Sequence, residues 1–346
     1  MNILFMVGNG LDLQYGLKTK YTDFFDNQKR SYNKDNIIYQ EIYNHFISGS
    51  EDKVAENWSD LEFEIGKLTK EKPELVDTLS KQEDYISCFE EVCLDFYEYL
   101  KVAQLKFDPT NKCVDLSRLI KTIPEHLYTK DKDRWDICID NNNLIEDTIS
   151  IMTFNYTNRL DILYENSEKV FSGSLKSDKG KTTVNSIVHA HGELDNIPIL
   201  GINDLSQIYD GFNLDLANYL VKKEAIDASR ENHNERNFKL INEANLIIIY
   251  GMSIGETDKY FWERIARHSI DNGVPIIIYH YYNKGAWRSS HITMQRLYDS
   301  IEKQFIKLSN TTEYNEVYLR NNMLIIINSD MESKKLFVYE DAHTAY

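Results

Sequence analysis

The opening residues constrain the fold of this chain more than any other segment. Residues 2–7 (NILFMV) form a continuous apolar run that ends at Gly8-Asn9-Gly10, and LDL follows. A short apolar run without alternation is typical of a strand covered on both faces, and Gly-x-Gly leading into a helix is typical of a nucleotide-binding α/β fold. The third glycine of the dinucleotide fingerprint is missing, unless Gly16 takes its place.

Five later runs have the same character as the first. They are rich in Ile, Leu and Val and nearly continuous, which is the pattern of parallel strands with helices on both faces. They cover residues 149–154, 186–190, 245–250, 274–280 and 323–327. Together with the opening run they predict an α/β fold built on a Rossmann-like parallel sheet of about six strands.

A long stretch between the first two predicted strands has a different pattern. Residues 20–145 contain no convincing strand, and apolar residues recur at helical spacing, most clearly over 83–105. Ser59 and Glu62 have the spacing of a capping box at the start of another helix. We therefore predict a large α-helical insertion subdomain at 20–145.

The remaining residues are assigned to the sheet domain. Residues 1–19 and 146–346 are predicted to form the nucleotide-binding domain that the insertion interrupts. A further helical stretch is expected at 205–243, ahead of the fourth predicted strand, and another at 288–307.

Charge and composition exclude several classes of protein. The net charge of −16 disfavours extended binding of DNA or RNA but not a nucleotide, because backbone N–H groups at a helix N-terminus bind phosphate without basic side chains. The four cysteines form no CxxC pair, so we expect no zinc ribbon. No apolar run is long enough for a membrane span, and the N-terminus lacks a signal-peptide pattern, so we expect a cytoplasmic protein.

Polar residues lie at the carboxyl end of the second predicted strand. Thr153 and Asn155 lie where ligands bind in parallel sheets, beyond the carboxyl ends of the strands. Thr157 or Asn158 is expected to cap the next helix, but capping does not account for Asn155, whose amide suits a ribose hydroxyl or a water.

Two histidines lie at the carboxyl end of the third predicted strand. His189 and His191 are two residues apart, and either imidazole could act as a general base near pH 7. Glu193 and Asp195 are the nearest additional metal ligands, which is too few for a convincing site, so no metal is predicted. A structural histidine in a turn is the alternative for each ring.

The fourth predicted strand also ends in a glycine loop. Gly251 and Ser253 could line an adenosine pocket, and Thr257 is expected to be the N-cap of the next helix. A simple turn is an equal alternative for this loop and for Gly8–Gly10. Asp12 lies in the first helical turn, where the alternative role of its carboxylate is to stabilise the helix through the helix dipole.

Six motifs in this order resemble the AbiH family of bacteriophage abortive infection proteins. They span most of the chain: GNGLDL with GLKTKYTDF (16–24), NWSDLE (57–62), FNYTN (154–158), HAHGEL (189–194), GIND (201–204) and YGMSIGETD (250–258). AbiH proteins are in turn distantly similar to the SIR2-like domains of anti-phage NAD hydrolases. The resemblance therefore implies a SIR2-like fold that uses NAD as its substrate.

The resemblance also implies roles for individual residues. Asn155 and His191 correspond to the catalytic asparagine and general base, and the remaining positions are implied to contact NAD: Gly8, Asn9, Gly10, Asp12, Thr153, Gly251 and Ser253. Sirtuin deacetylases carry a four-cysteine zinc module, and an acid commonly follows their asparagine two residues on. Here no CxxC exists and position 157 is threonine, which disfavours protein deacetylation.

Two functions follow from this resemblance. The first is cleavage of NAD to nicotinamide and ADP-ribose after a phage trigger of unknown identity, with the insertion 20–145 as the place for a sensor or a homo-oligomer interface. The second is a non-enzymatic nucleotide-binding sensor that arrests growth through a partner. A phosphohydrolase would need clustered carboxylates for Mg²⁺, and the candidates are scattered along the chain: Asp12, Asp195, Asp204 and Asp258.

Overall fold

The chain divides into two compact units. The computed structural model describes residues 1–48, 61–140, 146–195, 198–228, 233–283, 288, 290–329 and 333–342. The first unit contains Met1–Leu11, Asp108–Ala190 and Glu235–Tyr346, and the second contains Asp12–Phe107 and His191–Asn234. Ser59 of the predicted capping box lies outside the described residues.

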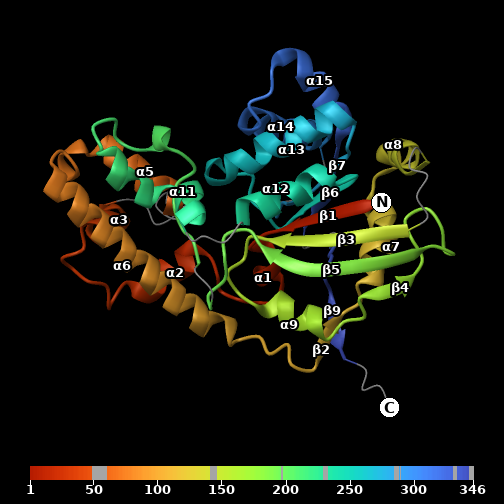
Figure 1. The fold of residues 1–346 in the computed structure, drawn as a ribbon, viewed down its shortest axis with the longest axis horizontal. Helices are drawn as coiled ribbons and strands as arrows, with labels where there is room; N and C mark the ends of the chain where they lie inside the picture. The colour runs from red at the N-terminus through yellow and green to blue at the C-terminus, as the bar shows by residue number, and fades with distance from the viewer. Residues whose placement is uncertain are drawn as a thin grey trace. The chain divides into compact units, whose positions relative to one another are not determined.

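A seven-stranded sheet forms the centre of the first unit (Figure 1). Its strands are β1 (Asn2–Val7), β3 (Glu146–Thr153), β4 (Val170–Ser172), β5 (Lys181–His189), β6 (Leu246–Tyr250), β7 (Ile276–Tyr281) and β8 (Met323–Asn328). The spatial order is β4-β5-β3-β1-β6-β7-β8, and every pair is parallel except β4 with β5. The six predicted strands and the Rossmann-like α/β fold are therefore confirmed, and β4 is an addition.

The strand order places a topological switch beside β1. The chain runs outward from β1 through β3 to β5 on one side, and through β6, β7 and β8 on the other. Val7 at the end of β1 is level with Thr153 of β3 and Tyr250 of β6. Because ligands of doubly wound sheets bind where the strand order reverses, the loops after these three strands define the expected site.

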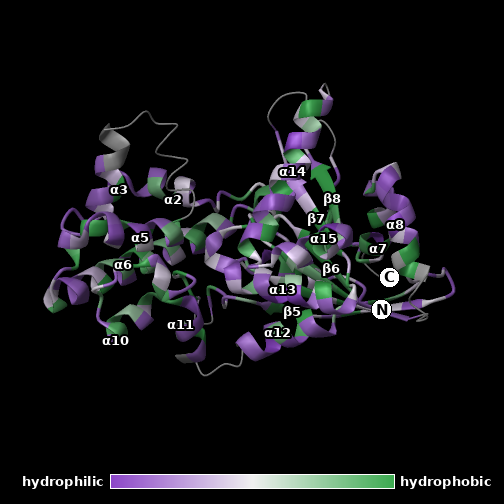
Figure 2. Ribbon diagram, turned by 90° about the horizontal axis from the view of Figure 1, so that it is seen from above, coloured by the Kyte–Doolittle hydropathy of each residue, from purple (hydrophilic) through white to green (hydrophobic). Residues whose placement is uncertain are grey.

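Helices α12 (His233–Glu243), α13 (Lys259–Asn272), α14 (His291–Leu308) and α15 (Glu313–Asn322) contribute to the core on one face of this sheet. Alternate strand residues such as Ile247 and Ile249 share that core with Trp262 and Phe305, which are fully buried. Full burial of one large apolar side chain stabilises a fold by about 1.5–3 kcal/mol. In Figure 2, β8 is coloured hydrophobic, whereas α12 and α13 carry both hydrophilic and hydrophobic residues.

The opposite face of the sheet carries the alternate side chains. Phe5 packs edge-on against Phe337, with ring centroids 5.6 Å apart, and the hydroxyl of Tyr250 accepts a hydrogen bond from the Leu336 N–H. His126, the last residue of α7 (Ser117–His126), lies 3.0 Å through its Nδ1 from the hydroxyl of Tyr279. A polar pair is therefore built into a largely apolar face.

His126 makes stability depend on pH. Burial, together with the nearby charge of Lys334, lowers the pKa of the His126 imidazole from its usual 6.5 to about 4. The unfolded chain therefore takes up this proton near pH 6.5 and the folded protein only near pH 4, so folding weakens as the pH falls through that window. After allowance for solvent screening of a half-buried ring, we expect a loss of about 1–2 kcal/mol.

Denaturant unfolding of wild type and His126→Asn between pH 4 and pH 7 checks this expectation. The difference in unfolding free energy between the two should shrink as the pH falls, because Asn does not titrate. A constant difference would mean that the ring does not contribute to the acid sensitivity.

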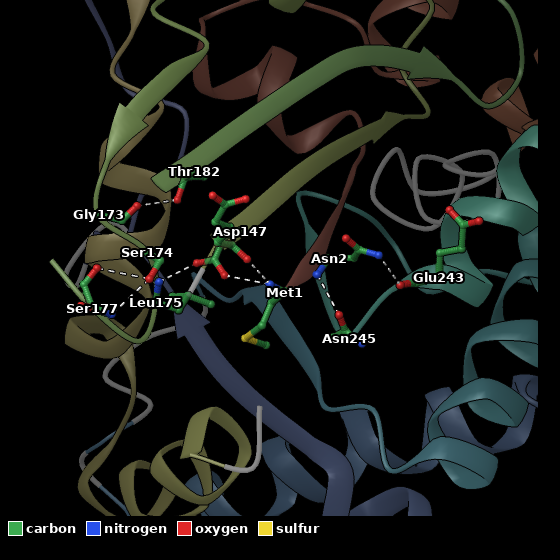
Figure 3. A network of polar contacts seen from close by, with 11 residues as sticks. Met1, Asn2, Asp147, Gly173, Ser174, Leu175, Ser177, Thr182, Glu243 and Asn245 are labelled. Atoms are coloured by element: carbon green, nitrogen blue, oxygen red, sulfur yellow. Dashed lines mark hydrogen bonds and ion pairs between the residues drawn. The ribbon is translucent and has the colours of Figure 1, made fainter. Parts of the chain in front are cut away.

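A polar network closes the amino-terminal edge of the sheet (Figure 3). The Met1 ammonium lies 3.1 Å from the Asp147 carboxylate, whose second oxygen accepts a 2.6 Å hydrogen bond from the Leu175 N–H. The N–H of Asn2 donates to the Asn245 side chain at 2.8 Å. The Met1 ammonium and the Asp147 carboxylate therefore both have polar partners, although the two residues are buried.

The first unit also contains short elements that the apolar pattern does not reveal. They are α1 (Gly10–Gln14), which begins here, α8 (Thr129–Asp140), α9 (Arg159–Glu165), a 3₁₀ turn η4 (Glu256–Asp258), and the antiparallel pair β2 (Lys112–Val114) with β9 (Tyr339–Asp341). The expectation that residues 20–145 hold no strand was therefore wrong at β2. With three residues, this strand is too short to produce a periodic signal.

The second unit is helical. Its elements are α2 (Tyr21–Gln28), α3 (Ile37–Ser48), α5 (Leu61–Glu71), η1 (Pro73–Leu75), α6 (Leu79–Gln104), η2 (Leu205–Gln207), α10 (Leu214–Ala217), η3 (Asn218–Leu220) and α11 (Lys222–Ala228). The predicted long helix is confirmed as α6, whose Phe96 packs against Phe24 with ring centroids 5.3 Å apart. None of the helices in the described part of the chain has the length and apolar character needed to cross a bilayer.

A buried ion pair joins α5 to α11 within the second unit. Lys222 Nζ lies 2.6 Å from Glu62 Oε2, and the two side chains are 1% and 7% exposed. The Gly201 N–H also donates to Glu62, at 3.3 Å. Because isolated charges are costly in an apolar interior, each member of this pair depends on the other.

Candidate functional site

The loops after β1 and β6 contact each other through their backbones. The Gly8 N–H donates to the Tyr250 carbonyl at 3.0 Å, and the Gly10 N–H donates to the Gly251 carbonyl at 2.7 Å. Both amides are therefore used to join the two loops. This differs from a phosphate cradle, in which the glycine N–H groups point at the ligand.

Close approach explains the glycines at both positions. A Cβ on Gly8 would lie 2.6 Å from Cγ of Met252, and one on Gly10 would lie 2.6 Å from Cα of Gly251. Neither residue has a positive φ, so the turn does not require glycine for a left-handed backbone; Gly251, at φ +66°, does. These glycines bring β1 and β6 together at the switch point.

Gly251→Ala should be destabilising for two reasons, the left-handed backbone at this residue and its close contact with the β1 loop. The added Cβ meets a left-handed backbone and stands 3.0 Å from the Leu11 nitrogen. We expect a loss of about 2–3 kcal/mol in unfolding free energy, of which the backbone conformation alone accounts for about 1–2 kcal/mol.

Gly273 is the matched control for this substitution. It has the same φ of +66°, and a Cβ there would have nothing within 4 Å. Denaturant unfolding of Gly251→Ala and Gly273→Ala therefore isolates the cost of loop contact. Equal losses would show that the close approach carries no energy.

Asn155 is held immediately beyond β3. Its backbone N–H donates to Thr153 Oγ1 at 3.2 Å, and its carbonyl lies 3.0 Å from Nδ1 of His189. The residue is 6% exposed, and among the described residues no atom hydrogen-bonds its Oδ1. A buried amide oxygen without a partner is costly, so the position favours a ligand that donates a hydrogen bond.

His189 lies at the end of β5 and links the loop after β3 to helix α9. While Nδ1 faces the Asn155 carbonyl, Nε2 lies 3.1 Å from both carboxylate oxygens of Asp161 on α9. Asp161 was not among the predicted site residues. Its only sequence signal is a place in the helix after FNYTN, and nothing there connects it with a histidine 28 residues on.

A second buried amide lies on α12. Asn237 is fully buried, and its Nδ2 donates to the Ala190 carbonyl at 3.3 Å. Its Oδ1 has no hydrogen-bond partner within the described ranges. Ala190 in turn donates to the Thr153 carbonyl at 2.8 Å, so Asn237 is connected to the ends of β5 and β3. Sequence reasoning placed residue 237 in a helix but did not assign it a role.

The remaining predicted site residues are distributed as follows. Gly8, Gly10, Thr153, Asn155 and Gly251 come together at the carboxyl ends of β1, β3 and β6, whereas Ser253 is exposed beyond β6. Asn9 follows Gly8 and is partly exposed.

Two predicted residues belong to the second unit. Asp12 is buried, and its carbonyl accepts hydrogen bonds from the N–H groups of Tyr15 and Leu17. His191 is also buried, and its carbonyl accepts from the Ile199 N–H at 2.8 Å. Both are therefore part of ordered local structure.

Two expected features of these loops, helix capping and the absence of a metal site, concern neighbouring residues. The N-cap of α13 is Asp258 rather than Thr257, because residues 256–258 form a 3₁₀ turn before the helix. Asn158 is the N-cap residue of α9, although its side chain makes no capping hydrogen bond and instead accepts from Arg159. No group of three potential metal ligands occurs among the residues that the structure describes.

Comparison with known proteins gives a family match. A family model described as bacteriophage abortive infection AbiH matches residues 4–280. No curated protein matches the chain. The matched range includes the loops after β1, β3, β5 and β6, as well as the helical second unit.

Proposed function

The chain belongs to the AbiH family of bacteriophage abortive infection proteins, and we propose that it defends the cell by hydrolysing NAD when a phage infects. The family indicates the anti-phage role, since its model covers most of the chain. The chemistry is inferred from the resemblance to SIR2-like NAD hydrolases together with the site. It rests on the first unit, in which a doubly wound sheet offers its switch point for a dinucleotide.

One observation carries the proposal. Asn155 is a buried amide at the carboxyl end of β3, fixed at its backbone N–H by Thr153 and at its carbonyl by His189. Its Oδ1 is left to accept a hydrogen bond from something other than the described protein residues. A ribose hydroxyl or the attacking water has the donor that this oxygen lacks.

The proposed reaction breaks the bond between nicotinamide and its ribose. Water adds to C1 of the ribose, the electron pair of the C–N bond leaves with the nicotinamide nitrogen, and one proton is released. The transition state resembles an oxocarbenium ion, so an oriented ribose and a correctly placed water lower the barrier. Asn155 supplies that orientation, and the resemblance to SIR2-like domains assigns the proton to His191.

In this proposal the glycine loops do not bind the phosphates through their backbone N–H groups. The N–H groups of Gly8 and Gly10 are occupied by the β6 loop, so Asn9 and the exposed Ser253 are the polar side chains offered to the pyrophosphate and adenosine ends. The glycines allow the two loops to meet at the switch point. Asp12 remains a proposed contact on the resemblance alone.

A purified-protein assay tests the proposal. The chain is incubated with NAD, with and without lysate of phage-infected cells, and nicotinamide release is followed for wild type, Asn155→Ala and His191→Ala. We expect release by wild type in at least one condition and its loss in Asn155→Ala. Protection from phage without any release would instead support the nucleotide-binding sensor.

A further inference from the structure

His189 faces a hydrogen-bond acceptor at each ring nitrogen. The Asn155 carbonyl lies 3.0 Å from Nδ1, and the Asp161 carboxylate lies 3.1 Å from Nε2. Neither group carries a proton to donate. A neutral imidazole has one N–H and satisfies one of these acceptors, whereas an imidazolium has two N–H groups and satisfies both.

The Asp161 carboxylate beside Nε2 favours the charged form of the ring. The His189 side chain is 10% exposed and that of Asp161 is 30% exposed, so the charge pair is shielded on the histidine side. Asp161, on α9, places a negative charge against the ring, and the Asn155 carbonyl, after β3, directs the negative end of its dipole at the ring. Hydrogen bonds to ionised groups are shorter and stronger than those between neutral groups.

We propose that His189 is a positioning residue, which as an imidazolium bridges the Asp161 carboxylate and the Asn155 carbonyl and thereby fixes the Asn155 amide. This inference rests on the proposed hydrolysis of NAD and adds to it a second histidine, which does not contact the substrate. The chain of contacts runs from α9 through the β5 end to the β3 loop. His189 touches Asn155 through the backbone, so it acts on the orientation of the amide and not on the substrate.

Two substitutions separate charge from position. His189→Phe keeps a planar aromatic ring but removes both hydrogen bonds, so the Asn155 loop loses one of its two backbone anchors. Asp161→Asn keeps both hydrogen bonds with a neutral ring, because Nδ1–H still donates to Asn155 and Nε2 accepts from the new amide. The pair therefore distinguishes positioning from the mere presence of a charge.

We expect different kinetics from the two variants. His189→Phe should lower kcat for nicotinamide release by about 10–100-fold while KM changes little, because a small misplacement of a catalytic group has effects of this size. Asp161→Asn should keep kcat close to that of wild type. In ¹⁵N spectra of histidine-labelled protein at pH 7.5, both His189 nitrogens should be protonated in wild type and only one in Asp161→Asn.

Each opposing result has a distinct meaning. A neutral His189 ring in wild type would overturn the bridge, and a folded His189→Phe protein with wild-type kcat would overturn the positioning role while leaving NAD hydrolysis intact. If wild type releases no nicotinamide in any condition, the proposed hydrolysis is wrong and this inference fails with it, whatever the spectra show.

Discussion

Asn155→Ala should reduce NAD cleavage by on the order of 10²–10³-fold while the protein stays folded. The substitution removes the buried amide whose oxygen has no hydrogen-bond partner among the described residues, and with it the group proposed to orient the ribose or the water. The backbone anchors at Thr153 and His189 do not involve the side chain and are kept. Loss of kcat with unchanged thermal unfolding is therefore the expected signature.

Asn158→Ala is the matched control for this prediction. It alters another asparagine three residues along the same loop, whose side chain accepts from the neighbouring Arg159. Its rate of nicotinamide release should remain near that of wild type. An active Asn155→Ala protein, or equal losses in the two variants, would remove Asn155 from the proposed mechanism.

Lys222→Ala should destabilise the chain by about 3–5 kcal/mol, because it removes the ammonium paired with the buried Glu62 carboxylate in the interior of the second unit. The Gly201 N–H that also reaches Glu62 is a single neutral donor and does not replace an ammonium. Denaturant unfolding should show a midpoint well below that of wild type. This effect concerns the fold of the second unit and not the chemistry of the first.

Two further variants locate the cause of that loss. The double substitution Glu62→Gln/Lys222→Met removes both charges and should recover most of the stability, since a paired charge is often replaceable by neutral groups of similar size. Lys81→Ala removes an exposed partner of Asp77 and should cost at most about 1 kcal/mol. If Lys222→Ala costs no more than Lys81→Ala, the buried pair does not stabilise the unit.

Much of the fold was predictable from sequence because strands buried on both faces leave a strong compositional signal. All five residues of β6 are buried, and the apolar run at 245–250 located it to within one residue. The long α6 likewise has a repeating apolar face that includes Phe89, Val92 and Phe96. Where packing dictates the residue type at every position, the pattern identifies the element.

Short elements escaped prediction for the opposite reason. Strand β4 has one buried residue, Phe171, between two exposed ones, and β2 pairs only with β9 near the far end of the chain. Pairing between distant segments leaves no local pattern. Thr257 was expected as a cap because threonine favours that position, but the intervening 3₁₀ turn moved the helix start to the next residues.

The candidate site was likewise predictable from sequence only in part. The polar residues at strand ends were recognisable, because carboxyl ends of parallel strands meet at one edge. The use of the Gly8 and Gly10 amides by the β6 loop was not, since it depends on two segments separated by more than 200 residues. The contact between His189 and Asp161 is of the same kind.

The NAD content of infected cells is the most direct test of the proposed function. Cells that carry the wild-type chain, the Asn155→Ala variant or no chain are infected, and NAD, nicotinamide and ADP-ribose are measured until lysis. With the wild-type chain, NAD should collapse before lysis as nicotinamide and ADP-ribose appear, and with Asn155→Ala both the collapse and the protection should be lost. Protection by the wild-type chain while NAD stays constant would contradict NAD hydrolysis as its means of defence.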